Sequence, residues 1–274
     1  MSTLPAFDRQ QAIYLLPLIV GCGALVQFAT LWRGVRKARA FAALGRRYER
    51  RLQGAGLRVL ILGDSTGVGV GAARPEDSIA GLLAADFPQA DVVNVSESGA
   101  KVADTLAQAR ALKDSVQRVD VAFLHVGGND IVRATPLDRL AEDCERLLVE
   151  LAAFSDRVVW LAPPNIGIAP LFPRPYSWLV AARSRAANAV FAQCASRHGV
   201  AFVNLSDAEH QMRFLKARAE HFATDRFHPS SSSYRYGYTV ARRAFDFKAF
   251  SVAANDGAMP TKSPLSDGVE PAAA

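Results

Sequence analysis

The stretch LRVLILGDSTGVG, residues 57–69, decides the fold. Its first six residues are almost all apolar, which is typical of a strand that is buried on both faces of a parallel sheet. Gly63 ends this run, and small or polar residues follow as far as Gly69. Ser65 comes directly after the strand, and we therefore expect it at the edge of the sheet where ligands bind. Its backbone N–H would open the next helix and point towards an anion.

The same alternation of strand and helix continues towards the C-terminus. Further apolar runs predict strands at 91–95, 119–126, 157–162 and 200–205. Amphipathic stretches predict helices at 76–87, 103–113, 137–154, 178–198 and 232–247. Strands that are separated by helices pair in parallel, with helices on both faces of the sheet. The sequence therefore predicts one α/β domain over residues 56–250, with a mostly parallel five-stranded sheet.

An uncharged segment precedes this domain. No charged side chain lies between Arg9 and Arg33. As a helix this segment would be about 34 Å long, against a bilayer hydrocarbon core of about 30 Å. We expect a transmembrane anchor over 11–32, preceded by a short tail over 1–10. A cleaved signal peptide and a lipoprotein with a lipid on Cys22 are the two alternatives.

The net charge of +6 belongs to one short segment. Residues 33–51 hold eight basic side chains and one acidic side chain, which leaves 24 basic and 25 acidic residues elsewhere. The domain therefore lacks the basic face that nucleic-acid binding requires. We expect residues 33–55 to form a basic juxtamembrane helix or linker that binds anionic lipid head groups. Under the positive-inside rule, the same cluster places the domain on the cytoplasmic side of a single-pass membrane protein.

Two features of the sequence argue against a disulfide framework and against a metal site. The three cysteines form neither a disulfide framework nor a CxxC pair, and His210, His221 and His228 lack the spacing of a metal site. We therefore expect no metal and no cofactor. Residues 251–274 are rich in Ala, Pro, Ser and Gly without periodicity, which predicts a disordered tail.

Three further segments are predicted to end at the same sheet edge as Ser65. Asn129 follows the third strand, and its amide N–H suits a developing oxyanion. Gly99 follows the second strand and offers a backbone N–H. In DRFHP, residues 225–229, the proline keeps His228 extended. Asp225 can then fold back onto one imidazole nitrogen and leave the other for a hydroxyl. Each motif alone is also typical of an ordinary helix cap or turn, and only their convergence indicates a site.

Four of these stretches together resemble the blocks of the SGNH hydrolase superfamily, the GDSL-like esterases and lipases. They are ILGDSTGVG (61–69), NVSESG (94–99), HVGGND (125–130) and DRFHPS (225–230). The resemblance covers about residues 57–247 and implies a flavodoxin-like, three-layer α/β/α fold. It also implies Ser65 as nucleophile, His228 as general base and acid, and Asp225 as its orienting partner. The implied oxyanion donors are the N–H groups of Ser65 and Gly99 and the side chain of Asn129.

The resemblance predicts an enzyme that hydrolyses carboxylic esters or thioesters through an acyl-enzyme at Ser65. Its partners would be a small acyl-ester substrate and membrane lipid, with no nucleic acid. Asp64 and Asp130 would order their loops. We expect Phe172, Tyr176 and Trp178 to line an acyl pocket or form a lid; that they simply cover the edge of the core is an equal alternative.

Three alternatives remain open on the sequence. A catalytically silent SGNH-like domain would serve as a membrane-bound binding module. Residues 63–67 also fit the G-x-S-x-G elbow of α/β-hydrolases, although no HGGG-type segment precedes them. Residues 67–72 fit the G-x-G-x-x-A pattern of a dinucleotide-binding module, although the second strand lacks an acidic end. Thr66 stands where many SGNH members have leucine, so no subfamily is assigned.

Overall fold

The computed structural model of the protein describes residues 9–112 and 118–245, and side chains only from residue 21 onward. Five strands form the sheet: β1 Leu57–Gly63, β2 Ala90–Asn94, β3 Val119–His125, β4 Ser155–Leu161 and β5 Ala201–Val203. Their order is β2-β1-β3-β4-β5, and every pairing is parallel. This is the flavodoxin-like order. The five predicted strands and their parallel sheet are therefore confirmed.

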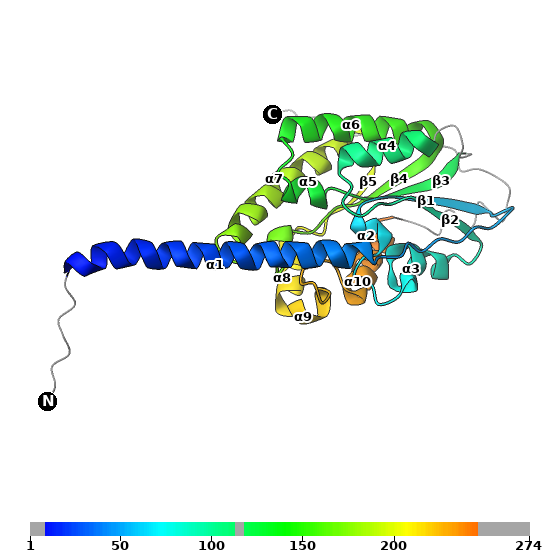
Figure 1. Ribbon diagram of the computed structural model, residues 1–274. Coiled ribbons are helices and arrows are strands. Elements are labelled where there is room, and N and C mark those ends of the chain that lie inside the picture. The colour runs from blue at the N-terminus through cyan, green and yellow to red at the C-terminus, as the bar shows by residue number, and fades with distance from the viewer. Residues whose placement is uncertain (1–8, 113–117, 246–274) are drawn as a thin grey trace, which may run out of the picture.

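Helices cover both faces of the sheet (Figure 1). One face carries α4 Val102–Leu112, α6 Leu137–Phe154 and α7 Tyr176–Arg197. The other face carries α3 Ile79–Asp86 and α10 Ser231–Ala244. Short helices follow three of the strands, α2 Ser65–Val68 after β1, α5 Gly128–Val132 after β3 and α8 Ala208–Lys216 after β5, and α9 Arg218–His221 follows α8. The architecture is the expected three-layer α/β/α sandwich.

The alternation of side chains along β1 divides the core into two halves. Leu57, Val59 and Ile61 pack with α3 and α10, whereas Leu60 and Leu62 pack with α4, α6 and α7. Successive side chains of a strand point to opposite faces, so a continuous apolar run is required where both faces are covered. β1 is thereby fixed as an interior strand of the sheet, between β2 and β3, and its carboxyl end is fixed with it.

Two local differences from the predicted helices have simple causes. Ser78 splits the predicted helix at 76–87, because its hydroxyl accepts the N–H of Gly81 and caps α3. Pro75–Asp77 before it form a 3₁₀ turn. The short helices α8 and α9 were not predicted, since they span only nine and four residues and α8 buries only Phe214.

The N-terminal helix α1, Arg9–Ala43, projects from the domain as one long rod (Figure 1). It passes without a break through the predicted boundary between the anchor over 11–32 and the basic segment over 33–55. Among the helices whose side chains the structure describes, none has both the length and the apolar composition to cross a bilayer. The predicted anchor is thus not supported by the structure, and the side chains of its residues 11–20 lie outside the described set.

Other predictions about the chain ends stay untested. Residues 1–8 and the predicted disordered tail, 251–274, lie outside the described residues. The cysteines Cys22, Cys144 and Cys194 are free thiols, in agreement with the absence of a disulfide framework.

Candidate active site

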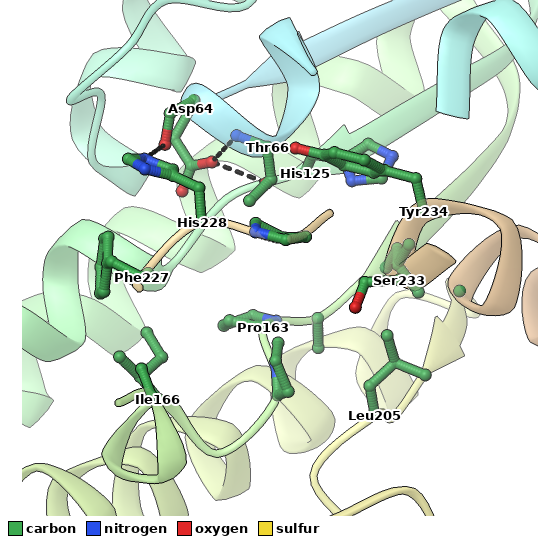
Figure 2. A pocket seen from close by; sticks show the side chains of 18 of the residues that line it. Asp64, Thr66, His125, Pro163, Ile166, Leu205, Phe227, His228, Ser233 and Tyr234 are labelled. Carbon is green, nitrogen blue, oxygen red and sulfur yellow. Dashed lines mark hydrogen bonds between the residues drawn. The ribbon is translucent and has the colours of Figure 1, made fainter. Parts of the chain in front are cut away.

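The end of β1 holds Ser65 at the carboxyl edge of the sheet. Gly63 has φ +137°, and a Cβ there would lie 1.9 Å from the carbonyl oxygen of His125, so a side chain cannot be accommodated. The Asp64 N–H donates to that same oxygen at 2.8 Å and ties β1 to β3. The Asp64 carboxylate caps α2 by accepting the N–H of Thr66 at 2.8 Å and its hydroxyl at 2.7 Å (Figure 2). Ser65 therefore occupies the first turn of α2, where it is 7% exposed.

The structure brings Ser65, His228 and Asp225 together from positions far apart in the chain. The Nε2 atom of His228 lies 3.1 Å from the Oγ atom of Ser65, across a separation of 163 positions. On the other side of the ring, Nδ1 lies 2.5 Å from Oδ2 of Asp225. All three side chains are buried. A hydroxyl, an imidazole and a carboxylate are thus in series, as the sequence predicts.

A tight turn presents His228 to Ser65. Arg226 has φ +65°, which lets the chain reverse between Asp225 and His228. The second carboxylate oxygen of Asp225 accepts the N–H groups of Phe227 and His228, both at 3.1 Å. The carbonyl of His228 in turn accepts the N–H of Ala223 at 2.9 Å. Asp225 therefore orders the turn with one oxygen and orients the imidazole with the other.

The electrostatics of this pair keep the carboxylate charged. Burial by itself raises the pKa of Asp225. The hydrogen bond to His228, the electrostatic attraction of the imidazole and the two backbone N–H groups lower the pKa by more than burial raises it. The pKa of Asp225 therefore lies below its ordinary value. An ionised Asp225 holds a proton on Nδ1 of His228. The lone pair of Nε2 then faces the Ser65 hydroxyl, which is the arrangement that a general base requires.

Two of the three predicted oxyanion donors, Ser65 and Asn129, line the same cavity. Asn129, in the first turn of α5, lines the same cavity as Ser65. One N–H of its amide donates to the carbonyl of Ala100 at 3.1 Å, which leaves the second N–H for a ligand. Gly99, with φ +92°, immediately precedes Ala100 but is not among the cavity-lining residues. The N–H of Ser65 lies in the first turn of its helix, where no intrahelical partner exists.

A cavity of about 120 Å³ adjoins Ser65 and His228 (Figure 2). One wall comes from the loop after β4, with Pro163, Pro164 and Ile166. The lining also includes Leu205 and Tyr234. Figure 2 shows Pro163, Ile166, Leu205 and Tyr234 around one space, with His228 at its rim. The lining is mostly apolar, which suits a hydrocarbon group better than a charged one.

The structure does not place Phe172, Tyr176 or Trp178 among the residues that line this cavity. The chain turns at the 3₁₀ segment Ile166–Ile168, which directs Ile166 inward and carries the aromatic residues away. Phe172 packs edge-on against Phe227 at 5.9 Å, one contact removed from the cavity. Trp178 is 61% exposed. The prediction that these residues line the acyl pocket is corrected accordingly.

Two buried histidines were not anticipated. His125, at the end of β3, lines the cavity and stacks on Phe123 with ring centroids 5.1 Å apart. Burial lowers its pKa to about 3, so the ring is neutral, and its Nε2 has no hydrogen-bond partner. His221 also lines the cavity, and its Nδ1 lies 3.2 Å from the Ser233 hydroxyl. The position of His125 at a strand end was a usable signal in the sequence, whereas His221 gave none.

Asp64 and Asp130 both order loops, as predicted. Asp130 accepts the N–H of Val102 at 3.0 Å and the hydroxyl of Thr135 at 2.9 Å. Burial raises the pKa of Asp64 to about 6. Among the described residues, no group of three or more His, Cys, Asp or Glu side chains could hold a metal ion.

This topology, with the proton relay Ser65–His228–Asp225 at the carboxyl edge of the sheet, is that of SGNH-type hydrolases. The chain belongs to the GDSL-like Lipase/Acylhydrolase family, whose profile matches residues 61–236. It is accordingly a hydrolase that acts on esters. A comparison with curated proteins gives no match.

Solved structures share the fold over most of the domain. A lipolytic protein of the G-D-S-L family from Veillonella parvula is 15% identical with a TM-score of 0.56, over 70% of this chain and 99% of the other. A catalytic mutant of Axe2, an acetylxylan esterase from Geobacillus stearothermophilus, is 24% identical with a TM-score of 0.53, over 71% and 96%. The psychrotrophic esterase EstA from Pseudoalteromonas sp. is 18% identical with a TM-score of 0.53, over 68% and 95%. At these identities the likeness concerns the fold.

Proposed function

We propose that the protein hydrolyses carboxylic esters through an acyl-enzyme at Ser65. The observation that carries this proposal is the 3.1 Å separation between His228 Nε2 and Ser65 Oγ, with Asp225 behind the ring. Ser65 Oγ attacks the ester carbonyl while His228 takes its proton, and the imidazolium then gives that proton to the leaving alcohol. Water repeats the sequence on the acyl-enzyme and releases the acid.

Three donors serve the tetrahedral oxyanion in this proposal. They are the N–H groups of Ser65 and Gly99 and the remaining amide N–H of Asn129. Asn129 is held in place by the carbonyl of Ala100, so its donor is oriented before the substrate arrives. Such preorganised donors stabilise the developing charge without reorganisation during the reaction.

The size of the cavity favours a short acyl group. Its volume of about 120 Å³ is well below the roughly 300–1,000 Å³ of pockets that hold drug-sized ligands. Acyl groups from acetyl to butyryl would fit beside Ser65. Acetylated sugars belong in the test because Axe2, which shares the fold, is an acetylxylan esterase. Short thioesters present the same carbonyl chemistry.

Labelling by a fluorophosphonate tests the nucleophile. The parent protein should be labelled, and Ser65→Ala should not be. Ser233→Ala is the matched control, because its hydroxyl lines the same cavity but lies outside the relay, and it should retain the label. A well-folded parent protein that takes up no label would contradict the proposal.

A chain-length series of p-nitrophenyl esters tests the acyl group, with acetylated xylose alongside. We expect kcat/KM to be highest from acetate to butyrate and to fall for octanoate. Gly237 in α10 lines the cavity, and an added Cβ would lie 3.5 Å from Leu161 and Leu205, in ordinary contact. Gly237→Ala should therefore fold normally and lower the rate on butyrate relative to acetate. A preference of the parent for octanoate or longer esters would contradict the assignment.

Membrane attachment through α1 is part of the proposal. The uncharged segment before Arg33 and the basic residues 33–51 support an anchor with the domain on the cytoplasmic side. Full-length protein should sediment with membranes after a high-salt wash, and the domain should resist protease added to sealed right-side-out cells. Recovery of the full chain in the supernatant would contradict the anchor.

A further inference from the structure

The second half of α1 docks on the domain through one apolar face. Its residues 21–30 are exposed, and burial begins at Leu31. The buried or half-buried positions recur three or four residues apart, as on one face of a helix. They are Leu31, Gly34, Val35, Ala38, Phe41 and Ala42. The basic residues Arg33, Arg36, Lys37 and Arg39 between these positions are exposed.

This docked part of α1 touches the loops that build the active site. The Lys37 ammonium donates to the carbonyl of Thr224, the residue before Asp225, at 3.3 Å. The hydroxyl of Ser98, the residue before Gly99, donates to the carbonyl of Ala42 at 3.2 Å. Gly34 is close to the loop after β4, since a Cβ there would lie 2.4 Å from Cδ1 of Leu171.

The chain after α1 is fixed to β2, an edge strand of the sheet. Arg50 pairs with Val92 of β2 through two backbone hydrogen bonds, of 3.0 and 2.7 Å. Its guanidinium donates to the carbonyls of Ala84, Phe87 and Ala90, at 2.5 to 3.2 Å. These are carbonyls at and just beyond the end of α3, where helices lack intrahelical donors and favour a cation. We call residues 31–52 the strap.

The strap reaches the relay itself at Phe41. The ring of Phe41 lies 6.4 Å from that of His228, centroid to centroid, with a tilt of 37°. Phe227 contacts the same imidazole edge-on at 5.0 Å. Both distances are within the range of aromatic contact. The imidazole is therefore held by hydrogen bonds at its two nitrogens and by two aromatic side chains, one of which comes from the N-terminal helix.

We propose that the strap is a working part of the catalytic site and that Phe41 is a positioning residue, which holds the His228 imidazole in line with Ser65. The proposal rests on the function assigned to Ser65 and His228. The strap lies outside the segment that matches the family profile, 61–236. A displacement of about 1 Å in a reacting group can cost about 10²-fold in rate. Phe41 acts on kcat because it orients the base and does not enclose the cavity, whose lining residues do not include it.

The test compares variants of the full chain by kcat and KM on p-nitrophenyl acetate, by the rate of fluorophosphonate labelling and by melting temperature. Phe41→Ala should lower kcat and the labelling rate by about 10- to 100-fold, in line with that sensitivity to misplacement, and leave KM within about threefold. Phe41→Leu keeps most of the apolar volume and should recover most of the loss. Phe28→Ala removes the same ring from an exposed position of the same helix and should change nothing.

A second variant undocks the strap without touching His228. Ala38 is 5% exposed, and Ala38→Asp would bury an unpaired charge in the docked face. It should reproduce the loss of kcat seen in Phe41→Ala. Either a kcat of Phe41→Ala within twofold of the parent, or a Phe41→Leu no better than Phe41→Ala, would overturn the proposal. If the function proposed for Ser65 were itself wrong, the result would be different, because Ser65→Ala would then still hydrolyse the ester and take up label.

Discussion

Replacing Asp225 by asparagine separates the two duties of this side chain. In the parent, one oxygen accepts the N–H groups of Phe227 and His228, and the other accepts the Nδ1 proton of His228 at 2.5 Å. In Asp225→Asn, the amide oxygen can keep the two backbone hydrogen bonds, so the turn should persist. The amide NH₂ would then face Nδ1, which must accept. The proton of the neutral ring therefore moves to Nε2, and Ser65 loses its base.

The expected loss is large in rate and small in stability. A ring in the wrong tautomer costs about 10⁴-fold in kcat, or about 5.4 kcal/mol of transition-state stabilisation. The variant should also lose a pH-dependent part of its stability. The pKa of Asp225 lies below its ordinary value in the folded state, so its charge stabilises the fold above the unfolded pKa and ceases to do so as the pH falls through the folded pKa.

The assay is the burst of p-nitrophenol on mixing with p-nitrophenyl acetate, with unfolding followed by calorimetry from pH 7 down to pH 3. Asp225→Ala is the control, because it removes the backbone acceptor as well and should lower the melting temperature in addition to the rate. A kcat for Asp225→Asn within tenfold of the parent would refute the tautomer argument. A melting temperature as low as that of Asp225→Ala would refute the claim that the turn persists.

Three further outcomes follow from the site. Asn129→Ala should lower kcat by about 10²–10³-fold, measured by steady-state kinetics, while the loss of one half-buried hydrogen bond to Ala100 costs only about 1 kcal/mol of unfolding free energy. His125→Phe should raise the melting temperature by removing an unpaired buried nitrogen. Because burial holds the pKa of His125 at about 3, the parent loses stability as the pH falls below 6.5. Calorimetry should therefore show a melting temperature that depends less on pH in the variant. Asp64→Asn should be more stable than the parent at pH 8 but not at pH 4. The pKa of Asp64 is raised from 3.8 to about 6 in the folded protein, so ionisation of this group costs the parent at most about 3 kcal/mol of unfolding free energy as the pH rises from 4 to 8. If the difference in unfolding free energy between variant and parent were the same at both pH values in denaturant melts, the argument would be wrong.

The strands and the relay were predictable because their signals are local. A strand buried on both faces needs an unbroken apolar run, and β1 has one that stops at Gly63. In the relay, the Asp225–His228 pair lies within one turn, and parallel topology places that turn and Ser65 at one edge. Sequence periodicity therefore carried most of the fold, whereas the motifs after the strands and their resemblance to the SGNH blocks carried the three relay residues.

The pocket was not predictable in the same way. Aromatic residues after β4 suggested a lining, but the path of residues 165–178 depends on how the loop packs against Ser184 and α7. The Ile166 N–H donates to the Ser184 hydroxyl at 3.1 Å, a contact between positions 18 apart that sets the direction of the loop. Ile166 is thereby turned towards the cavity, and Trp178 towards solvent. A composition-based prediction has no access to that contact.

The strap shows why an amphipathic stripe alone does not reveal its partner. Its apolar positions from Leu31 to Ala42 were present in the sequence, but the surrounding basic residues favoured an interpretation as a lipid-binding linker. The contacts of Lys37 with Thr224, across 187 positions, and of Phe41 with His228 show that the helix meets the loop that carries Asp225 and His228. Those two residues must hold their geometry to within a fraction of an ångström for proton transfer. The orientation of α1 and the orientation of the imidazole are therefore coupled through Phe41, so that any force that tilts the helix also changes the rate at which Ser65 is activated.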